Sequence, residues 1–165
     1  MIALKRILVA TDFGDAAGVA LDYGREFART FGASLDVLHV ADNAIARGFG
    51  VDGFTVDYSA LQRDLEAAAR KQLDALLDEE DRTMLHAKPV LLISGSPALA
   101  IVEYARESQA DLILMGTHGR GGMAHLLMGS VAERVVRIAP CPVLTVRHPE
   151  REFVLPDALV AVAKA

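Results

Sequence analysis

The sequence predicts an open, doubly wound α/β domain of the Rossmann-like type, in which helices cover both faces of a five-stranded parallel sheet. Short apolar runs alternate along the chain with longer segments of helical periodicity. Several of these runs are apolar at successive positions, which is typical of parallel strands buried on both faces. A chain of 165 residues is long enough for one such domain. The predicted strands are 7–10, 35–40, 90–93, 112–115 and 143–146.

The first helix is predicted directly after the first strand. Asp15 is the candidate N-cap, and Gly32 stands where a left-handed C-cap glycine belongs. Apolar residues recur between them at helical spacing and predict one buried face. These residues are Ala16, Ala20, Tyr23, Phe27 and Phe31.

Three further helices are predicted. One begins near residue 97, with Ser96 as its N-cap and Pro97 in its first turn. Another begins at Ser130, where Ser130 and Glu133 match the capping-box pattern. The remaining helix precedes both in the chain and carries an apolar stripe of Leu61, Leu65, Ala69, Leu73 and Leu76.

Composition restricts the class of partner. The formal net charge is −5, and the isoelectric point is about 5.5, which argues against a nucleic-acid partner. Cys141 is the single cysteine, so an intramolecular disulfide is excluded and a buried, inert thiol is expected. No signal-peptide layout and no apolar run of membrane-spanning length is present. We therefore expect a cytoplasmic protein that makes no contact with a membrane.

A glycine-rich segment is the most informative motif. An apolar run ending at Met115 is followed by Gly116-x2-Gly119-x9-Gly129-Ser130. Glycines allow the backbone to turn tightly and bring its N–H groups near a ligand, and a following helix N-terminus attracts anions. This spacing matches neither the P-loop nor the compact dinucleotide-binding motif. The segment predicts a phosphate site of a different pattern.

That spacing resembles the nucleotide-binding motif of the universal stress protein family. The resemblance extends to Ile7-Leu-Val-Ala-Thr-Asp12, to Leu38-His-Val40 and to Gly95-Ser-Pro97, and it covers about residues 4–148. It implies the strand order 3-2-1-4-5 and a ligand between the first and fourth strands, where strand order reverses. It also implies a nucleotide-binding domain over 1–148, with 149–165 as a C-terminal extension.

The resemblance implies ATP as the ligand, with AMP as an alternative and with Mg²⁺ carried by the phosphates. Asp12 would lie near the adenine and ribose, while Val40 and Met115 would line the adenine slot. Ala132 departs from family members that carry a hydroxyl there, which leaves one phosphate contact in doubt. The implied site comprises Thr11, Asp12, Val40, Met115, Gly116, His118, Gly119, Arg120, Gly129, Ser130 and Val131.

Most of these residues also have a purely structural interpretation. The glycines are common between strands and helices, and Val40 and Met115 suit the core of any such sheet. Asp12 and His118 suit turns, Arg120 is typical of a solvated loop, and Ser130 stabilises a helix start without a ligand. No histidine or cysteine spacing indicates a dedicated protein metal site.

Catalysis is not indicated beyond slow ATP hydrolysis, because no Walker lysine or metal-binding aspartate pair is recognisable. The predicted fifth strand, from Cys141 to Arg147, would be an exposed edge. In the family this strand commonly contributes to a homodimer, and we expect the same here. The alternative is a dimeric interaction module of the same fold that binds no nucleotide.

Overall fold

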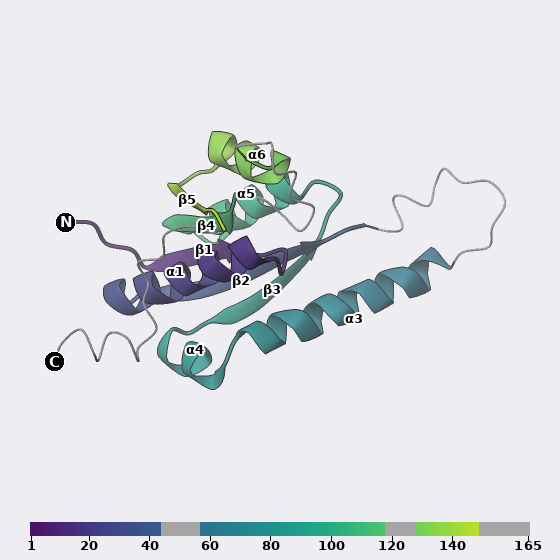
Figure 1. Cartoon of the computed structure of the whole chain (residues 1–165), viewed down its shortest axis with the longest axis horizontal. Coiled ribbons are helices and arrows are strands. Elements are labelled where there is room, and N and C mark those ends of the chain that lie inside the picture. Colours follow the sequence, from purple (N-terminus) through teal and green to yellow (C-terminus); the bar gives the residue numbers. More distant parts are fainter. Residues whose placement is uncertain (44–56, 118–127, 149–165) are drawn as a thin grey trace.

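The computed structural model describes residues 1–43, 57–117 and 128–148 and contains the predicted sheet (Figure 1). All strand pairs are parallel, and the strand order is β3-β2-β1-β4-β5, so both predictions are confirmed. The predicted strand positions are confirmed to within two residues. The strands are β1 (Arg6–Ala10), β2 (Ser34–Ala41), β3 (Lys88–Ile93), β4 (Leu112–Gly116) and β5 (Val143–Val146).

The central strand β1 is the point at which strand order reverses. At its carboxyl end Ala10 is level with Leu38 of β2 on one side and with Met115 of β4 on the other. The chain leaves β1 and β4 in loops that begin beside each other. The crevice where ligands of this fold class bind therefore starts at these two strand ends.

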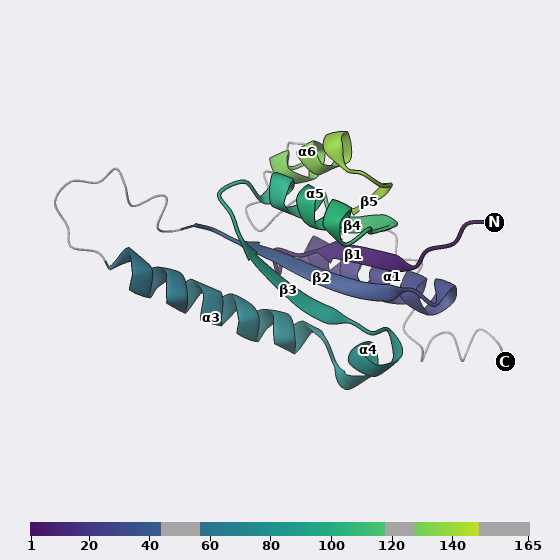
Figure 2. The same ribbon diagram turned by 180° about the vertical axis from the view of Figure 1, so that it is seen from behind.

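Alternate side chains of the strands point to opposite faces of the sheet and form two core clusters. Ile7 and Val9 pack with the helices α1 (Asp15–Phe31) and α3 (Tyr58–Leu76). Leu8 and Ala10 pack on the opposite side with α5 (Pro97–Glu107) and α6 (Ser130–Ile138). Figure 2 shows α5 and α6 on one side of the sheet and α3 on the other. The predicted covering of both faces is confirmed.

Gly24 lets the middle of helix α1 approach the sheet closely. A Cβ atom added to Gly24 would lie 2.6 Å from Val9 Cγ2 and 3.4 Å from Leu35 Cδ1. The helix ends at Gly32, which has a φ of 64° and so confirms the predicted left-handed C-cap. Its N-cap is Gly14, one residue before the predicted Asp15.

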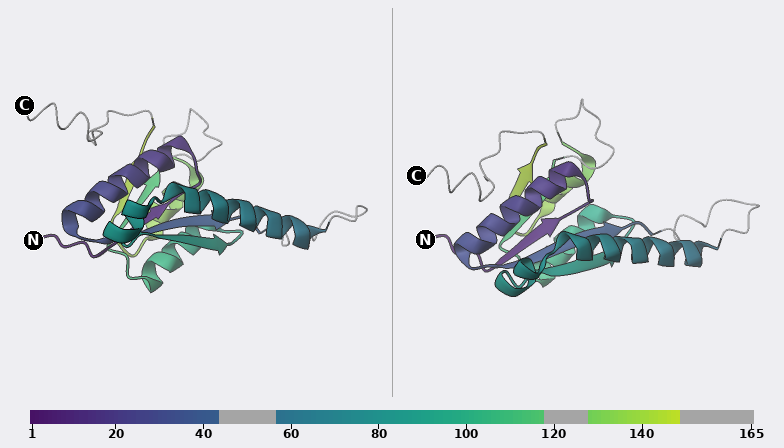
Figure 3. Two further views of the ribbon diagram at one scale, coloured as in Figure 1. Left: turned by 90° about the horizontal axis from the view of Figure 1, so that it is seen from below. Right: turned by 60° about the horizontal axis from the view of Figure 1, so that its bottom comes forward.

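Helix α3 extends beyond the sheet at the carboxyl ends of the strands (Figure 3). Asp57 caps it by accepting a hydrogen bond from the Ala60 N–H at 2.9 Å. The predicted stripe is only partly buried: Leu73 lies in the core, but Leu61 and Leu65 are 43% and 42% exposed. The first turns pass the end of the sheet, so their apolar side chains have no strand beneath them.

A short helix, α4 (Glu79–Met84), follows α3 and was not predicted. Asp78 and Asp81 form a capping box at its start. Asp81 is also buried against Arg25 of α1, with Arg25 Nη2 at 2.8 Å from Asp81 Oδ2. Arg25 Nη2 further donates to the carbonyl of Leu76 at 2.7 Å. One guanidinium thus ties α1 to the turn between α3 and α4.

The start of α5 is as predicted, with Ser96 at the N-cap and Pro97 in the first turn. The Ser96 hydroxyl makes no capping bond, and its N–H instead donates to Ser94 Oγ at 3.0 Å. No helix among the described residues is long and apolar enough to span a membrane.

We predict that Gly24→Ala lowers the free energy of unfolding by about 1–3 kcal/mol, because the new methyl group overlaps Val9 in a packed core. Gly18→Ala is the matched control in the same helix, because an added Cβ there meets no atom within 4 Å. It should stabilise the protein by about 0.5–1 kcal/mol. Urea denaturation checks both variants, and equal stabilities would contradict the close packing at Gly24.

Candidate functional site

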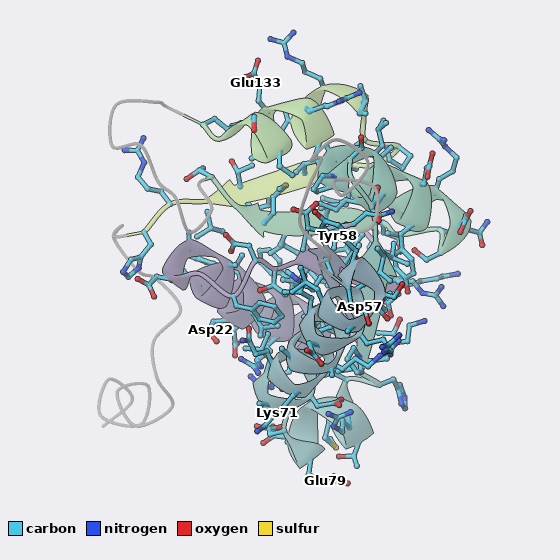
Figure 4. The ribbon with its side chains drawn as sticks, turned by 90° about the vertical axis from the view of Figure 1, so that its right-hand side faces the viewer. Asp22, Asp57, Tyr58, Lys71, Glu79 and Glu133 are labelled. Carbon is cyan, nitrogen blue, oxygen red and sulfur yellow. The ribbon has the colours of Figure 1, made fainter. Side chains whose placement is uncertain are left out.

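The candidate site lies at the carboxyl ends of β1, β2 and β4. Thr11 and Asp12 directly follow β1, Val40 is near the end of β2, and Met115 and Gly116 end β4. Figure 4 views this side of the molecule, with α6 and its Glu133 at the top and with Asp57 and Tyr58, at the start of α3, near the centre. Gly129, Ser130 and Val131 form the start of α6. His118, Gly119 and Arg120 lie outside the described residues.

Two backbone hydrogen bonds bring the halves of the glycine motif together. The Thr117 N–H donates to the carbonyl of Val146 at 2.7 Å, which extends the pairing of β4 with β5 by one residue. The Gly129 N–H donates to the carbonyl of Thr117, also at 2.7 Å. The chain therefore leaves the sheet at Thr117 and returns beside the same residue. Gly116 and Ser130 therefore lie near each other at the end of β4, although 13 residues separate them in the sequence.

Helix α6 begins without a side-chain cap. Its N-cap is Gly129, in an extended conformation with φ −70° and ψ 154°, and Ser130 is the first helical residue. The predicted capping box of Ser130 and Glu133 is wrong, because Gly129 occupies the cap position one residue earlier. Glu133 instead forms an ion pair with Arg137 at 2.8 Å. Gly129 thus offers no side-chain acceptor to the first N–H groups of α6, which is a feature of anion-binding helix termini.

The turn after β1, in contrast to the start of α6, places a side-chain acceptor at its helix start. The Gly14 N–H donates to Asp12 Oδ1 at 3.0 Å, which places a carboxylate at the beginning of α1. The carboxylate lies at the positive end of the α1 dipole, the position that an anionic ligand would otherwise occupy. A second anion would be repelled there. At the start of α6 the N-cap Gly129 carries no charge, and Glu133 of the first turn is paired with Arg137. Of the two helix termini at the crevice, α6 is the one suited to phosphate.

Gly116 has a packing role that the motif alone does not reveal. An added Cβ would lie 2.8 Å from Ala16 Cβ, 3.1 Å from Ala16 C and 3.2 Å from Ala17 N. Two of these atoms belong to the backbone of α1, which cannot move independently of its helix. The absence of a side chain at Gly116 lets the first turn of α1 rest directly on the end of β4. The structural interpretation of this glycine is thus supported by its contacts.

Val40 and Met115 are on the α5 and α6 side of the sheet. Met115 is buried, and Val40 is partly buried against the same cluster. Thr11 is buried as well, and its N–H donates to the Leu38 carbonyl at 2.8 Å. Both apolar residues belong to the core at a strand end, which is compatible with an adenine-lining role and does not require one.

Two residues that the sequence did not single out complete the turn after β1. Phe13 has a φ of 65°, which is rare for a residue with a large side chain. Its ring lies on the imidazole of His39, with centroids 4.3 Å apart and planes 39° apart. His39 Nδ1 lies 2.8 Å from the Thr11 carbonyl oxygen. Neither contact has a sequence signal, because both depend on a backbone conformation that spacing does not encode.

The single cysteine has no sign of reactivity. Burial raises the pKa of the Cys141 thiol, and the nearby Asp111 carboxylate raises it further. A reactive thiol requires the opposite shift. Within 1–43, 57–117 and 128–148, no three histidine, cysteine or acidic side chains are grouped so that they could hold a metal ion.

Comparison with known proteins identifies the family. A model described as the universal stress protein family matches residues 3–147. The chain belongs to this family. It is 35% identical over 148 residues to the universal stress protein MJ0531 of Methanocaldococcus jannaschii, a match that spans 90% of this chain and 85% of that protein.

Two solved structures support the fold. The structure of the protein MJ0577, also from Methanocaldococcus jannaschii, has a TM-score of 0.72 and 25% identity, and the match covers 92% of this chain and all of that one. A universal stress protein in complex with cAMP has a TM-score of 0.54 and 25% identity, with 88% of this chain and 98% of that one covered. The strand order inferred from the family resemblance is the order observed here.

We predict that Gly116→Ala lowers the free energy of unfolding by about 1–3 kcal/mol, because the added methyl group overlaps the backbone of α1. Gly95→Ala is the control, since an added Cβ at that loop position meets no atom within 4 Å. Thermal denaturation compares the two variants with the unaltered protein. A melting temperature for Gly116→Ala equal to that of the control would contradict direct packing of α1 on β4.

Proposed function

We propose that this universal stress protein binds ATP or AMP in the crevice between β1 and β4 and acts as a nucleotide sensor or buffer in the stress response. The observation that carries the proposal is the hydrogen bond from the Gly129 N–H to the Thr117 carbonyl, which joins both halves of the glycine motif at the uncapped start of α6. The cAMP complex of a related structure supports a nucleotide as the ligand class.

The proposed roles follow from where each group lies. Backbone N–H groups of Val131 and its neighbours at the start of α6 bind phosphate, and the exposed hydroxyl of Ser130 adds a donor. His118, Gly119 and Arg120 belong to the same motif by sequence. Asp12 and Thr11 accept hydrogen bonds from the nucleoside, with Val40 and Met115 beside the base. Mg²⁺ arrives with the phosphates of ATP and keeps several of its waters.

The proposed functional unit is the domain over 1–148, to which 149–165 is an extension, and the proposed location is the cytoplasm. Binding is the primary chemistry, with slow hydrolysis of ATP as the most that the residues support. Transfer of a phosphoryl group requires several charged groups on the phosphates, and Arg120 is the single arginine or lysine of the proposed site.

A homodimer through β5 is part of the proposal. The carbonyls of Pro142 and Val146 accept hydrogen bonds from β4, at 3.0 and 2.7 Å. Successive residues of a strand direct their N–H and C=O groups toward opposite edges. Those of Val143 and Thr145 therefore point toward the free edge. The neighbouring helix α6 adds Val136 and Ile138, which are 46% and 40% exposed. An edge strand beside apolar side chains suits symmetric pairing with a second copy.

Calorimetric titration of nucleotide-free protein with ATP and Mg²⁺, and separately with AMP, tests the ligand. We expect one site per chain, and we expect Gly119→Val to weaken binding at least about tenfold, because its side chain fills space needed by phosphate. Gly95→Val is the control, because it adds the same side chain to the loop between β3 and α5.

Unchanged affinity in a folded Gly119→Val protein would overturn the assignment of the site. An absence of binding by unaltered protein shown to carry no nucleotide would overturn the nucleotide proposal and favour the interaction module. Nucleotide turnover by the unaltered protein and by Ser130→Ala decides whether hydrolysis accompanies binding.

Sedimentation velocity tests the dimer. We expect Thr145→Pro to give a monomer, because it removes an N–H that points away from β4 and so leaves the pairing of β5 with β4 in place. Thr145→Val keeps this N–H and should remain a dimer. A dimer that survives Thr145→Pro, in protein with the normal circular dichroism spectrum, would contradict pairing through β5.

A further inference from the structure

The turn between β1 and α1 contains the most unusual backbone conformation near the proposed site. Phe13 has a φ of 65°, in the left-handed region that bulky residues avoid. Such a conformation costs free energy and persists where the surroundings hold it in place.

Hydrogen bonds and a ring contact hold the turn from both sides. The Phe13 N–H donates to Thr11 Oγ1 at 3.0 Å, and the Phe13 ring lies on His39 at a centroid distance of 4.3 Å. His39 Nδ1 lies 2.8 Å from the Thr11 carbonyl oxygen. A carbonyl oxygen only accepts, so Nδ1 carries the proton. His39 therefore contacts the residues before and after Asp12.

The hydrogen bond from His39 occurs where the main-chain pairing stops. Registered pairing of β1 with β2 ends at Ala10 and Leu38, and the Thr11 N–H makes the last main-chain hydrogen bond to β2, at the Leu38 carbonyl. The imidazole donates a hydrogen bond to the Thr11 carbonyl at this point. A side chain of β2 thus continues the contact between β2 and the chain that leaves β1. Asp12 follows immediately, and its Oδ1 accepts the Gly14 N–H at 3.0 Å.

His39 performs this role from behind the proposed nucleotide crevice. Successive residues of a strand point to opposite faces, and the adjacent Val40 packs with the α5 and α6 cluster. Phe13, against which His39 lies, packs with the α1 cluster instead. His39 is thus on the α1 face and influences a ligand on the opposite face only through the turn.

We propose that His39 and Phe13 are positioning residues of the nucleotide site: together they hold Thr11 and Asp12 in the conformation that receives the nucleoside. The inference rests on the proposed function. Neither residue contacts the ligand in this account. Their effect is to preorganise the turn, so that binding does not require ordering it first.

The decisive comparison separates the hydrogen bond of His39 from its ring. His39→Phe keeps an aromatic ring but removes the donor, and we expect it to weaken AMP binding about five- to tenfold, the value of one lost hydrogen bond in a preorganised turn. His39→Asn places an amide N–H close to the position of Nδ1 and should bind within about threefold of the unaltered protein. His86→Asn, at an exposed histidine outside the turn, should bind normally.

Amide hydrogen exchange provides a readout that does not depend on nucleotide. In His39→Phe the N–H groups of Phe13 and Gly14 should exchange faster, because the turn that holds their acceptors is released, while β4 amides remain protected. In His39→Asn both should stay protected. Calorimetry with AMP and exchange measured on the same samples give the two results side by side.

Weaker binding and faster exchange in His39→Phe, with both restored in His39→Asn, support the proposal. Faster exchange with unchanged affinity overturns the link between the turn and nucleotide binding. Unchanged exchange in His39→Phe overturns the positioning role itself. If the unaltered protein binds no nucleotide, the proposed function fails, and the positioning of a nucleotide by this pair fails with it, whatever the exchange data show about the turn.

Discussion

The hydrogen bond between the Gly129 N–H and the Thr117 carbonyl is the contact on which the candidate site depends. It fixes the start of α6 at the end of β4, next to the point where β1 leaves the sheet. Without it, Gly116 and Ser130 would be two unrelated ends of a long connection. With it, the first N–H groups of α6 lie at the strand ends where strand order reverses, and a ligand bound there as proposed would contact a rigid sheet on one side and a helix dipole on the other.

Charge at the crevice is divided between two helix termini. Asp12 places its carboxylate at the start of α1 through the Gly14 N–H, whereas α6 starts at Gly129 with no side-chain cap. A nucleotide has one strongly anionic end and one neutral end with several donors. The arrangement favours the phosphates at α6 and the nucleoside near Asp12, because a carboxylate accepts hydrogen bonds and repels phosphate.

Much of the architecture was predictable because it follows from burial patterns. Runs of apolar residues predicted all five strands, and Gly32 predicted the end of α1 by its need for a left-handed conformation. The errors occur where geometry rather than residue type decides. Ser130 has the residue type of an N-cap, but Gly129 holds that position, and the stripe from Leu61 continues past the end of the sheet. The contact of Phe13 with His39 depends on one positive φ angle, which no spacing in the sequence indicates.

The central claim is that phosphate binds at the start of α6 and not at the start of α1. Backbone amide chemical shifts during titration with AMP, compared with titration with adenosine, test it most directly. The account predicts phosphate-dependent shifts at Ser130, Val131 and Ala132 that AMP produces and adenosine does not, while the amides of Asp15 to Ala17 respond equally to both. Phosphate-dependent shifts centred on Asp15 to Ala17, with none at the start of α6, would contradict it.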